Sequence, residues 1–175
     1  MTIRVAILTV SDKGSRGERN DRSGPALVQW LASLAVGGAA VGIAAVEVAA
    51  TALVADEQAL IVNALRQWTD TTAVDLILTT GGTGLSPRDV TPEATLEVID
   101  RLVPGFSEAM RAASLAKTPH AMLSRAVCGI RHRTLIVNLP GSPAAAIENL
   151  EAIWPAIPHA IAKLQGDTQD CVPPQ

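Results

Sequence analysis

The sequence predicts a single α/β domain built on a doubly wound, mostly parallel sheet that is flanked by helices, as in Rossmann-like proteins. Two short runs, residues 5–10 and 74–78, are apolar apart from Thr9 and Asp75, which is typical of strands that helices cover on both faces. Segments with apolar residues at helical spacing separate the strand-like runs, and this alternation favours a parallel sheet. Polar, glycine-rich segments follow several of these runs, where open α/β sheets bind their ligands.

The first half of the chain provides three of the expected strands. Ser23 is a favourable N-cap, Pro25 suits a first helical turn, and Gly37-Gly38 ends the apolar periodicity, so a helix is expected between them. Asp56-Glu57 similarly opens a helix that reaches Trp68. In chain order, the expected elements are a strand at 5–10, a loop at 11–22, a helix at 23–37, a strand at 41–48, a connection at 49–55, a helix at 56–68 and a strand at 74–78.

The second half of the chain repeats the alternation and ends in a tail. Pro104-Gly105 and Thr118-Pro119 interrupt two helical patterns, and Pro155 and Pro158 divide a third into two pieces. The expected elements are helices at 92–101, 106–116 and 144–164 and strands at 126–130 and 134–138. We expect one domain over residues 1–165 and a polar tail at 166–175 that frays.

Composition excludes several classes of function. The chain has 175 residues, 48% of them hydrophobic, but no apolar run long enough to span a bilayer and no N-terminal signal pattern, so a cytoplasmic location is expected. A net charge of −3 and only 2% aromatic residues argue against nucleic-acid or anionic-membrane binding. Cys128 and Cys171 lack the spacing of a metal site and are expected to be free thiols.

One segment between a strand and a helix carries the residues for phosphate chemistry. Thr80-Gly81-Gly82-Thr83-Gly84 follows the apolar run at 74–78, and Thr91-Pro92-Glu93 begins the next helix with an N-cap, a proline and an acidic first turn. Glycines let backbone N–H groups approach an anion closely, and Arg88 can neutralise it. A carboxylate such as Asp89 repels phosphate unless a cation lies between them, so the segment predicts a phosphate held with Mg²⁺.

The common nucleotide-binding motifs do not match this segment. The P-loop requires Lys followed by Ser or Thr where Leu85-Ser86 stand, and the dinucleotide fingerprint requires a third glycine where Pro87 stands. What remains is the geometry of an open sheet, whose ligands bind beyond the carboxyl ends of the strands. The polar segments expected at that edge are Ser11-Asp12, the loop at 81–89, the corner Pro140-Gly141-Ser142, and Asp56 at the start of a helix.

Each candidate residue also has a structural alternative. Asp56 can be an N-cap, Asp12 can accept hydrogen bonds within its own turn, and Ser142 can cap a helix while presenting N–H groups to a ligand. Asp89 can pair with Arg88 instead of a metal. The residues whose role stays open are Arg111, Arg125 and Arg131, any of which can meet a substrate phosphate, and His120, His132 and His159, which are interpreted as structural or solvated.

Taken together, these segments resemble the molybdopterin adenylyltransferase family, which includes the MogA type of bacteria and the G domains of plant Cnx and animal gephyrin proteins. The resemblance covers roughly residues 3–165, and the pattern from Gly81 to Pro92 is specific to the wider molybdopterin-binding superfamily. The segments that carry it are Thr9-Val10-Ser11-Asp12, Asp21 to Pro25, Asp56-Glu57, Leu78 to Thr95, Met122 to Arg125, Cys128 to Arg131 and Asn138 to Ser142. The short segment between Leu150 and Pro155 is closer to the gephyrin type.

The resemblance implies a reaction, its cofactor and its residues. The terminal phosphate of molybdopterin attacks the α-phosphorus of ATP with Mg²⁺ present, giving adenylylated molybdopterin and pyrophosphate. Asp56 and Asp89 match the two acidic positions that matter most in the family, both for catalysis and for the metal. The residues expected to bind the substrates are Ser11, Asp12, Thr80, Gly81, Gly82, Thr83, Gly84, Ser124, Pro140, Gly141 and Ser142. A homotrimer and a separate molybdenum-insertion protein as partner are also implied.

Three other functions remain open at this stage. A paralogue of the MoaB kind would share the fold and adenylylate weakly or not at all. An oligomeric scaffold would correspond to the clustering role of gephyrin-type domains, although the chain lacks their linker and second domain. Hydrolysis of a nucleotide pyrophosphate is the third alternative.

Overall fold

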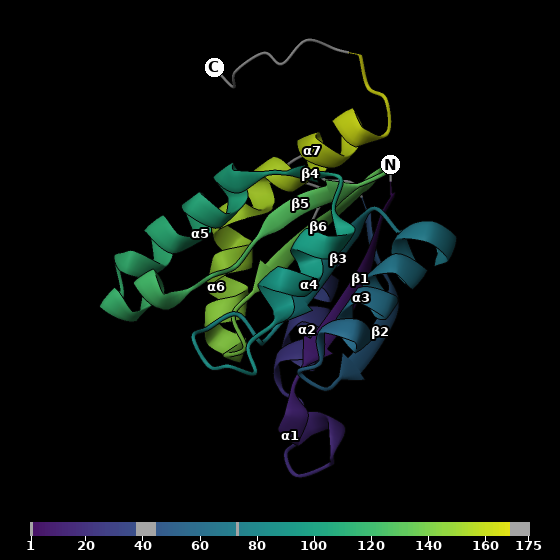
Figure 1. The fold of residues 1–175 in the computed structure, drawn as a ribbon. Helices are drawn as coiled ribbons and strands as arrows, with labels where there is room; N and C mark the ends of the chain where they lie inside the picture. The colour runs from purple at the N-terminus through teal and green to yellow at the C-terminus, as the bar shows by residue number, and fades with distance from the viewer. Residues whose placement is uncertain (1, 38–44, 73, 169–175) are drawn as a thin grey trace.

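The computed structural model describes residues 2–37, 45–72 and 74–168, and these form one mixed α/β sheet protein (Figure 1). The strands are β1 Thr2–Val10, β2 Ala45–Val54, β3 Leu76–Thr80, β4 Arg101–Leu102, β5 Cys128–Arg131 and β6 Thr134–Leu139. The α-helices are α1 Asp12–Ser15, α2 Ser23–Gly37, α3 Gln58–Gln67, α4 Thr91–Val98, α5 Pro104–Leu115, α6 Pro143–Ile153 and α7 Ile157–Leu164. Trp68–Thr72 is a π-helical turn, and Pro119–Leu123 and Trp154–Ala156 are 3-10 turns.

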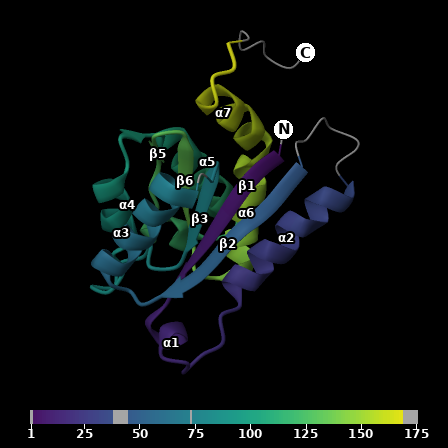
Figure 2. The same ribbon diagram turned by 90° about the vertical axis from the view of Figure 1, so that its right-hand side faces the viewer.

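The six strands form a single sheet in the order β2-β1-β3-β6-β5-β4 (Figures 1 and 2). The pairs β1–β2, β1–β3 and β3–β6 are parallel, whereas β5 is antiparallel to both β6 and β4. The predicted doubly wound, mostly parallel sheet is therefore confirmed. Within the described ranges, no helix combines the length and the apolar character that crossing a membrane requires.

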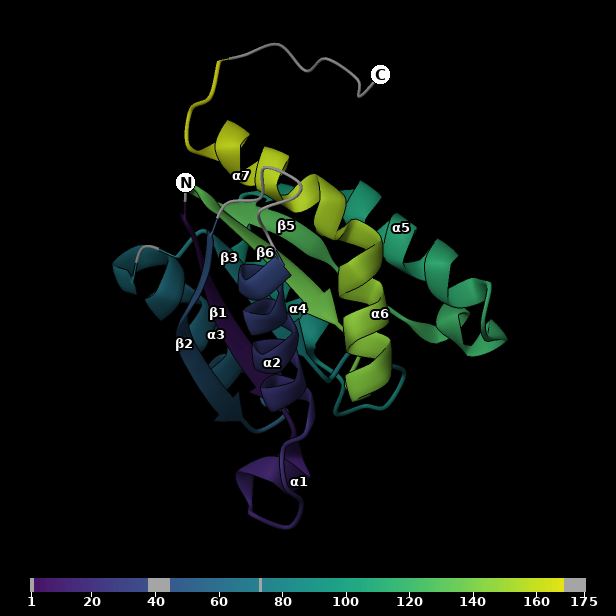
Figure 3. The same cartoon turned by 180° about the vertical axis from the view of Figure 1, so that it is seen from behind.

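Helices cover both faces of the sheet and create two hydrophobic clusters. On one face lie α2, α5, α6 and α7, seen from behind in Figure 3. Their apolar side chains form one cluster with alternate residues of β1, such as Ile3 and Ile7. On the other face, α3 and α4 pack against the intervening residues, such as Leu8 and Val10. The alternation follows from the period of two along a strand, and coverage of both faces explains why every residue of the run 5–10 is buried.

The strand order locates a binding edge between β1 and β3. The chain leaves β1 toward β2 on one side, whereas β3 pairs with the other side of β1. A crevice forms at such a reversal, beyond the carboxyl ends of the parallel strands. The segments after β1, β2, β3 and β6 all lie at this end of the sheet, as expected from the sequence.

Several predicted boundaries are wrong, and strand pairing explains most of the differences. β2 runs to Val54, because its backbone pairs with β1 up to the partners Val10 and Val54; the predicted connection at 49–55 is mostly strand. Its alanines lower the intrinsic strand propensity, but pairing outweighs that preference. Residues 41–44 of the predicted strand lie outside the described residues.

Other boundaries shift for local reasons. Helix α4 ends at Val98 instead of residue 101, since Arg101–Leu102 pairs with β5 as an edge strand. Helix α5 begins at Pro104, which occupies the first turn rather than breaking the helix, as its missing N–H allows. The predicted division of 144–164 into two helices is confirmed. Most of the predicted tail, residues 169–175, lies outside the described residues.

A buried asparagine joins the sheet to the helix that follows the glycine loop. Asn138 on β6 is completely buried, and its Nδ2 donates to the hydroxyls of Thr79 on β3 (3.0 Å) and Thr95 on α4 (2.9 Å). Its Oδ1 accepts a hydrogen bond from the Val127 N–H (3.2 Å). One amide therefore satisfies three polar groups in the interior, where an unpaired group is costly.

Replacing this amide should destabilise the fold. We expect Asn138→Ala to lower the free energy of unfolding by about 2–4 kcal/mol, because two hydroxyls and one N–H lose their partner in the protein interior. Urea denaturation of wild type and variant measures the change. Asn63→Ala, on the exposed side of α3, is the control and should alter stability by less than about 0.5 kcal/mol. Equal stability of Asn138→Ala and wild type would contradict the role assigned to this network.

Candidate active site

The glycine loop after β3 is held by close backbone contacts that leave no room for side chains. Gly81 has φ of +103° and Gly82 of +64°, a region that side-chain-bearing residues rarely adopt. A Cβ at Gly81 would collide with the carbonyl oxygen of Val10 at the end of β1. A Cβ at Gly141, after β6, would lie 3.2 Å from the Gly81 Cα. Three strand ends thus meet through backbone atoms.

Hydroxyl groups fix the loop on both sides of the glycines. Thr80 Oγ1 donates to the Pro140 carbonyl (2.8 Å), and Thr91 Oγ1 donates to the Gly81 carbonyl (2.9 Å). The sequence predicts Thr91 as the N-cap of α4, but Thr91 is the first helical residue and its hydroxyl ties the helix to the loop instead. The loop path is therefore determined before any ligand binds.

The N–H groups of Gly82, Thr83 and Gly84 make no hydrogen bond with any other described residue. By contrast, the Gly81 N–H donates to the Leu139 carbonyl (3.2 Å). Thr83 is only 7% exposed, and an unpaired N–H at such a position is unfavourable unless a ligand or water accepts from it. Consecutive free amides in a turned segment form a concave site for an anion.

Asp12 and Asp56 bridge the segments that follow β1 and β2. The Asp12 N–H donates to Asp56 Oδ2 (2.6 Å), and the Asp56 N–H donates to Asp12 Oδ1 (3.1 Å). Asp56 is therefore not the helix cap that its position suggests; Glu57 occupies the N-cap position of α3. Asp56 also lies beside the glycine loop, since its Oδ1 would be 3.1 Å from a Cβ at Gly82.

Arg88 makes a bidentate ion pair with Asp12, through Nε to Oδ2 (2.9 Å) and Nη2 to Oδ1 (2.8 Å). The predicted alternative, an Asp89–Arg88 pair, is wrong. The Arg88 guanidinium lowers the pKa of the Asp12 carboxyl. Burial raises the pKa of Asp56, and the negative charges of Asp12 and Asp89 add to the rise, against the hydrogen bond from Asp12 and the charge of Arg88.

Arg125 holds the second half of the loop. Its Nε donates to the Gly84 carbonyl (2.7 Å) and its Nη2 to the Asp89 carbonyl (2.5 Å), while Nη1 pairs with Glu93 in the first turn of α4. The Asp89 carboxylate lies inside this turn, where Oδ2 accepts from the Ser86 N–H (2.8 Å) and would be 3.0 Å from a Cβ at Gly84. Arg125, left open by the sequence, is thus a loop-positioning residue.

A polar cavity of about 200 Å³ opens on the β1 side of the glycine loop. It is bordered by the segments at the carboxyl ends of four strands, β1, β2, β3 and β6. Its lining residues are Thr9, Val10, Ser11, Gly14, Arg19, Asn20, Asp21, Ser23, Asp56, Thr80, Gly81, Gly82 and Gly141. Six of the predicted site residues are among them, namely Ser11, Asp56, Thr80, Gly81, Gly82 and Gly141.

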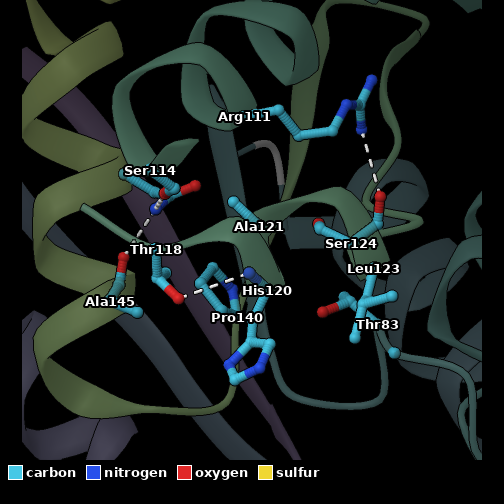
Figure 4. A pocket seen from close by; sticks show the side chains of 12 residues that line it. Thr83, Arg111, Ser114, Thr118, His120, Ala121, Leu123, Ser124, Pro140 and Ala145 are labelled. Carbon is cyan, nitrogen blue, oxygen red and sulfur yellow. Dashed lines mark hydrogen bonds between the residues drawn. The ribbon is translucent and has the colours of Figure 1, made fainter. Parts of the chain in front are cut away.

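A second cavity, of about 260 Å³, lies on the other side of the same loop (Figure 4). Side chains from α5, the 3-10 turn at Pro119–Leu123, the glycine loop and α6 surround it in that view. Among the described residues, its lining includes two basic side chains, Arg111 and His120, and no acidic one. The predicted site residues that line it are Thr83, Gly84, Ser124 and Pro140.

Three predicted site residues line neither cavity: Asp12, Asp89 and Ser142. The two aspartates are engaged in the contacts described above. Ser142 stands at the N-cap position of α6, but its hydroxyl makes no capping hydrogen bond. The glycine loop is a wall that both cavities share, with Pro140 lining one of them and Gly141 the other.

Sequence reasoning missed several residues of this site. Asp21 accepts from the Ser23 and Gly24 N–H groups (3.0 and 3.1 Å) and from the Thr9 hydroxyl (2.7 Å), so it caps α2 in place of the predicted Ser23. An aspartate two residues before a serine and four before a proline was an available signal. Arg19 and His120 had none, because only the folded chain places them at the cavities.

The carboxylates suit a Mg²⁺ ion that is shared with a phosphate, rather than one held by protein alone. No group of three His, Cys, Asp or Glu side chains in the described ranges has the arrangement of a closed metal site. Asp56 and Asp89 both border the glycine loop, and mutual repulsion contributes to the raised pKa of Asp56. A divalent cation would relieve that repulsion, and Mg²⁺ commonly uses one or two carboxylates plus phosphate oxygens.

Fold and site define a doubly wound α/β protein with a cavity on each side of a glycine loop at the carboxyl edge of its sheet. A family model described as a probable molybdopterin binding domain matches residues 6–159. The chain belongs to this family.

Named relatives extend over nearly the whole chain. The molybdopterin adenylyltransferase of Helicobacter pylori is 41% identical over 166 residues, which are 95% of this chain and 90% of that protein. Gephyrin of Dictyostelium discoideum is 43% identical over 97% of this chain but only 23% of its own length. The crystal structure of the molybdopterin biosynthesis enzyme MoaB from Thermus thermophilus is 55% identical, covers 94% of this chain and 98% of its own, and has a TM-score of 0.83.

The backbone contacts of Gly81 predict a strong effect of a single methyl group. Gly81→Ala should lower the free energy of unfolding by more than about 3 kcal/mol, because the Cβ meets the Val10 carbonyl in addition to the strained φ. Gly17→Ala is the matched control: Gly17 has φ of +71° but open space around it, so only about 1 kcal/mol is expected. Chemical denaturation of both variants tests this; equal losses would show that backbone contact is unimportant.

Proposed function

We propose that this chain is a molybdopterin adenylyltransferase, which transfers the adenylyl group of ATP to the terminal phosphate of molybdopterin and releases pyrophosphate. The observation that carries the proposal is the run of unpaired N–H groups at Gly82, Thr83 and Gly84 between two cavities. A reaction that joins two substrates requires two sites that meet at one phosphate-binding element. Relatives named for this activity align over almost the full chain.

In this proposal the glycine loop binds phosphate oxygens, and each cavity holds one substrate. The polar cavity, with Ser11, Thr80 and Gly81, receives the nucleotide phosphates. The second cavity, with Ser124 and Pro140, receives the pterin, because its lining offers an apolar surface together with hydroxyl groups. The free amides then lie where the two phosphates meet, and they are fixed in advance by the contacts of Thr80 and Thr91.

Asp56 and Asp89 would hold Mg²⁺ in this reaction. When bound, the ion neutralises phosphate charge and favours the departure of pyrophosphate. The chain itself positions the carboxylates: Asp12 fixes Asp56 through the reciprocal hydrogen bonds, and the Ser86 N–H together with the Arg125 clamp fixes the turn that contains Asp89. Phosphoryl-type transfer depends mainly on such positioning and on charge neutralisation.

A second candidate function, that of a MoaB-like paralogue with little adenylylation, is favoured by the 55% identity to the Thermus MoaB structure. The gephyrin relative brings a scaffold role into consideration, but this chain matches only 23% of that protein. The presence of two aspartates beside the loop favours an active enzyme over either alternative. A direct assay separates them.

The central test is formation of product. Purified protein incubated with molybdopterin, ATP and Mg²⁺ should give adenylylated molybdopterin and an equal amount of pyrophosphate, and chelation of Mg²⁺ with EDTA should stop both. Substrate binding without product, beside an active reference enzyme, would favour the MoaB-like alternative. Absence of binding as well would leave the scaffold role.

Substitution of one carboxylate tests its role in turnover. Asp89→Asn should keep the fold, since the amide oxygen can still accept from the Ser86 N–H, but should lower turnover by at least about a hundredfold through loss of charge at the metal. Asp100→Asn, at a carboxylate that accepts from the His132 N–H beside the β5–β6 hairpin, is the control and should keep its activity. Wild-type turnover in Asp89→Asn would show that Asp89 is structural.

Assembly, location and partners belong to the same proposal. We expect a homotrimer in the cytoplasm that hands its product to a molybdenum-insertion protein. Light scattering after size-exclusion chromatography should therefore give three times the chain mass of 18.2 kDa. A monomeric mass at micromolar concentration would be incompatible with the expected trimer.

A further inference from the structure

The loop between α1 and α2 places an arginine at the wall of the polar cavity. Arg19 lines this cavity together with Asn20 and Asp21, and it is the one basic residue among the described residues of the lining. Figure 1 shows α1 and the following loop projecting from the carboxyl end of β1. Residues far apart in sequence, Arg19 and Asp56, thus border the same space.

The backbone that carries Arg19 is anchored. The N–H groups of Glu18 and Arg19 both donate to the Lys13 carbonyl (2.9 and 3.2 Å), and the Ser11 hydroxyl accepts from the Gly14 N–H (3.1 Å) to cap α1. At its other end the loop joins the Asp21 cap of α2. The position of Arg19 at the cavity is therefore determined by hydrogen bonds at both ends of the loop.

Three other arginines near the site are paired with carboxylates. Arg16 pairs with Glu18 (2.7 Å), Arg88 pairs with Asp12 (2.8 Å), and Arg125 pairs with Glu93. The guanidinium of Arg19 makes no hydrogen bond or ion pair with any residue that the structure describes. Of these four arginines, Arg19 alone combines a place at the polar cavity with an uncommitted charge.

We propose that Arg19 binds a phosphate group of the nucleotide in the polar cavity. The inference rests on the proposed function and adds to it a residue that the glycine-loop pattern does not contain. A guanidinium offers a planar fork of donors that matches phosphate oxygens, and its charge does not depend on pH in the physiological range. The glycine loop, with the free amide of Gly82, supplies another wall of the same cavity. Arg19 also offsets part of the negative charge of the two acidic residues of the lining, Asp21 and Asp56, which would otherwise repel an anionic ligand.

Binding measurements separate this inference from the proposed function. Isothermal titration calorimetry with ATP, inorganic pyrophosphate and adenosine is carried out on wild type, Arg19→Gln and Arg16→Gln. Arg16→Gln is the matched control, since the substitution removes the same charge from the same loop, and Arg16 does not line the cavity. Thermal unfolding of the three proteins is followed in parallel, and similar midpoints are expected because both arginines are exposed.

Arg19→Gln should weaken ATP and pyrophosphate binding by about tenfold or more, as expected for a lost charge-assisted hydrogen bond, and leave adenosine binding unchanged. Arg19→Lys should bind ATP and pyrophosphate with an affinity between those of wild type and Arg19→Gln, because lysine keeps the charge but lacks the planar fork of donors. Equal affinity of Arg19→Gln and wild type for ATP would overturn the inference while leaving the proposed function intact. Failure of wild type to bind either phosphate ligand would overturn both.

Discussion

The convergence of three strand ends at Gly81 is the constraint on which the rest of the site depends. The Val10 carbonyl, the Gly81 backbone and the Gly141 backbone pack against each other without an intervening side chain. Since these segments follow β1, β3 and β6, the contact brings together loops that are distant in sequence. Strand pairing sets the spacing between the strands, and the glycines allow the loops that follow them to approach each other closely. The glycine loop that this contact holds lines both cavities.

The charged residues of the site are of two kinds. Some form ion pairs that hold loops in place, and others remain available to a ligand. Arg88 and Arg125 bind carboxylates and carbonyls of the protein, so they fix the conformation of the loops. Asp56 has the opposite character: burial and two negative neighbours raise its pKa rather than lower it. A site with excess negative charge on one wall and unpaired amides on another is suited to a phosphate that arrives with a cation.

The sequence was sufficient to predict the architecture, because a sheet between two layers of helices buries its strands and one side of each helix. Apolar runs and apolar residues at helical spacing report that burial. It was insufficient where pairing between distant segments decided the outcome. β2 continues through Val54 because β1 offers hydrogen-bond partners, and Arg88 pairs with Asp12 rather than with its neighbour Asp89. Asp12 and Asp56 are 44 positions apart, so no local pattern could show that each holds the N–H of the other. The cavity residues Arg19 and His120 were missed for the same reason.

The reciprocal bridge between Asp12 and Asp56 also has a consequence for dynamics. Each backbone N–H is held by the carboxylate of the other residue, and both belong to connecting segments that would ordinarily open easily. Opening either segment breaks both hydrogen bonds, so the two amides should exchange with solvent deuterium together and more slowly than neighbouring loop amides. The segments after β1 and β2 would thereby act as one cooperative unit at the edge of the sheet.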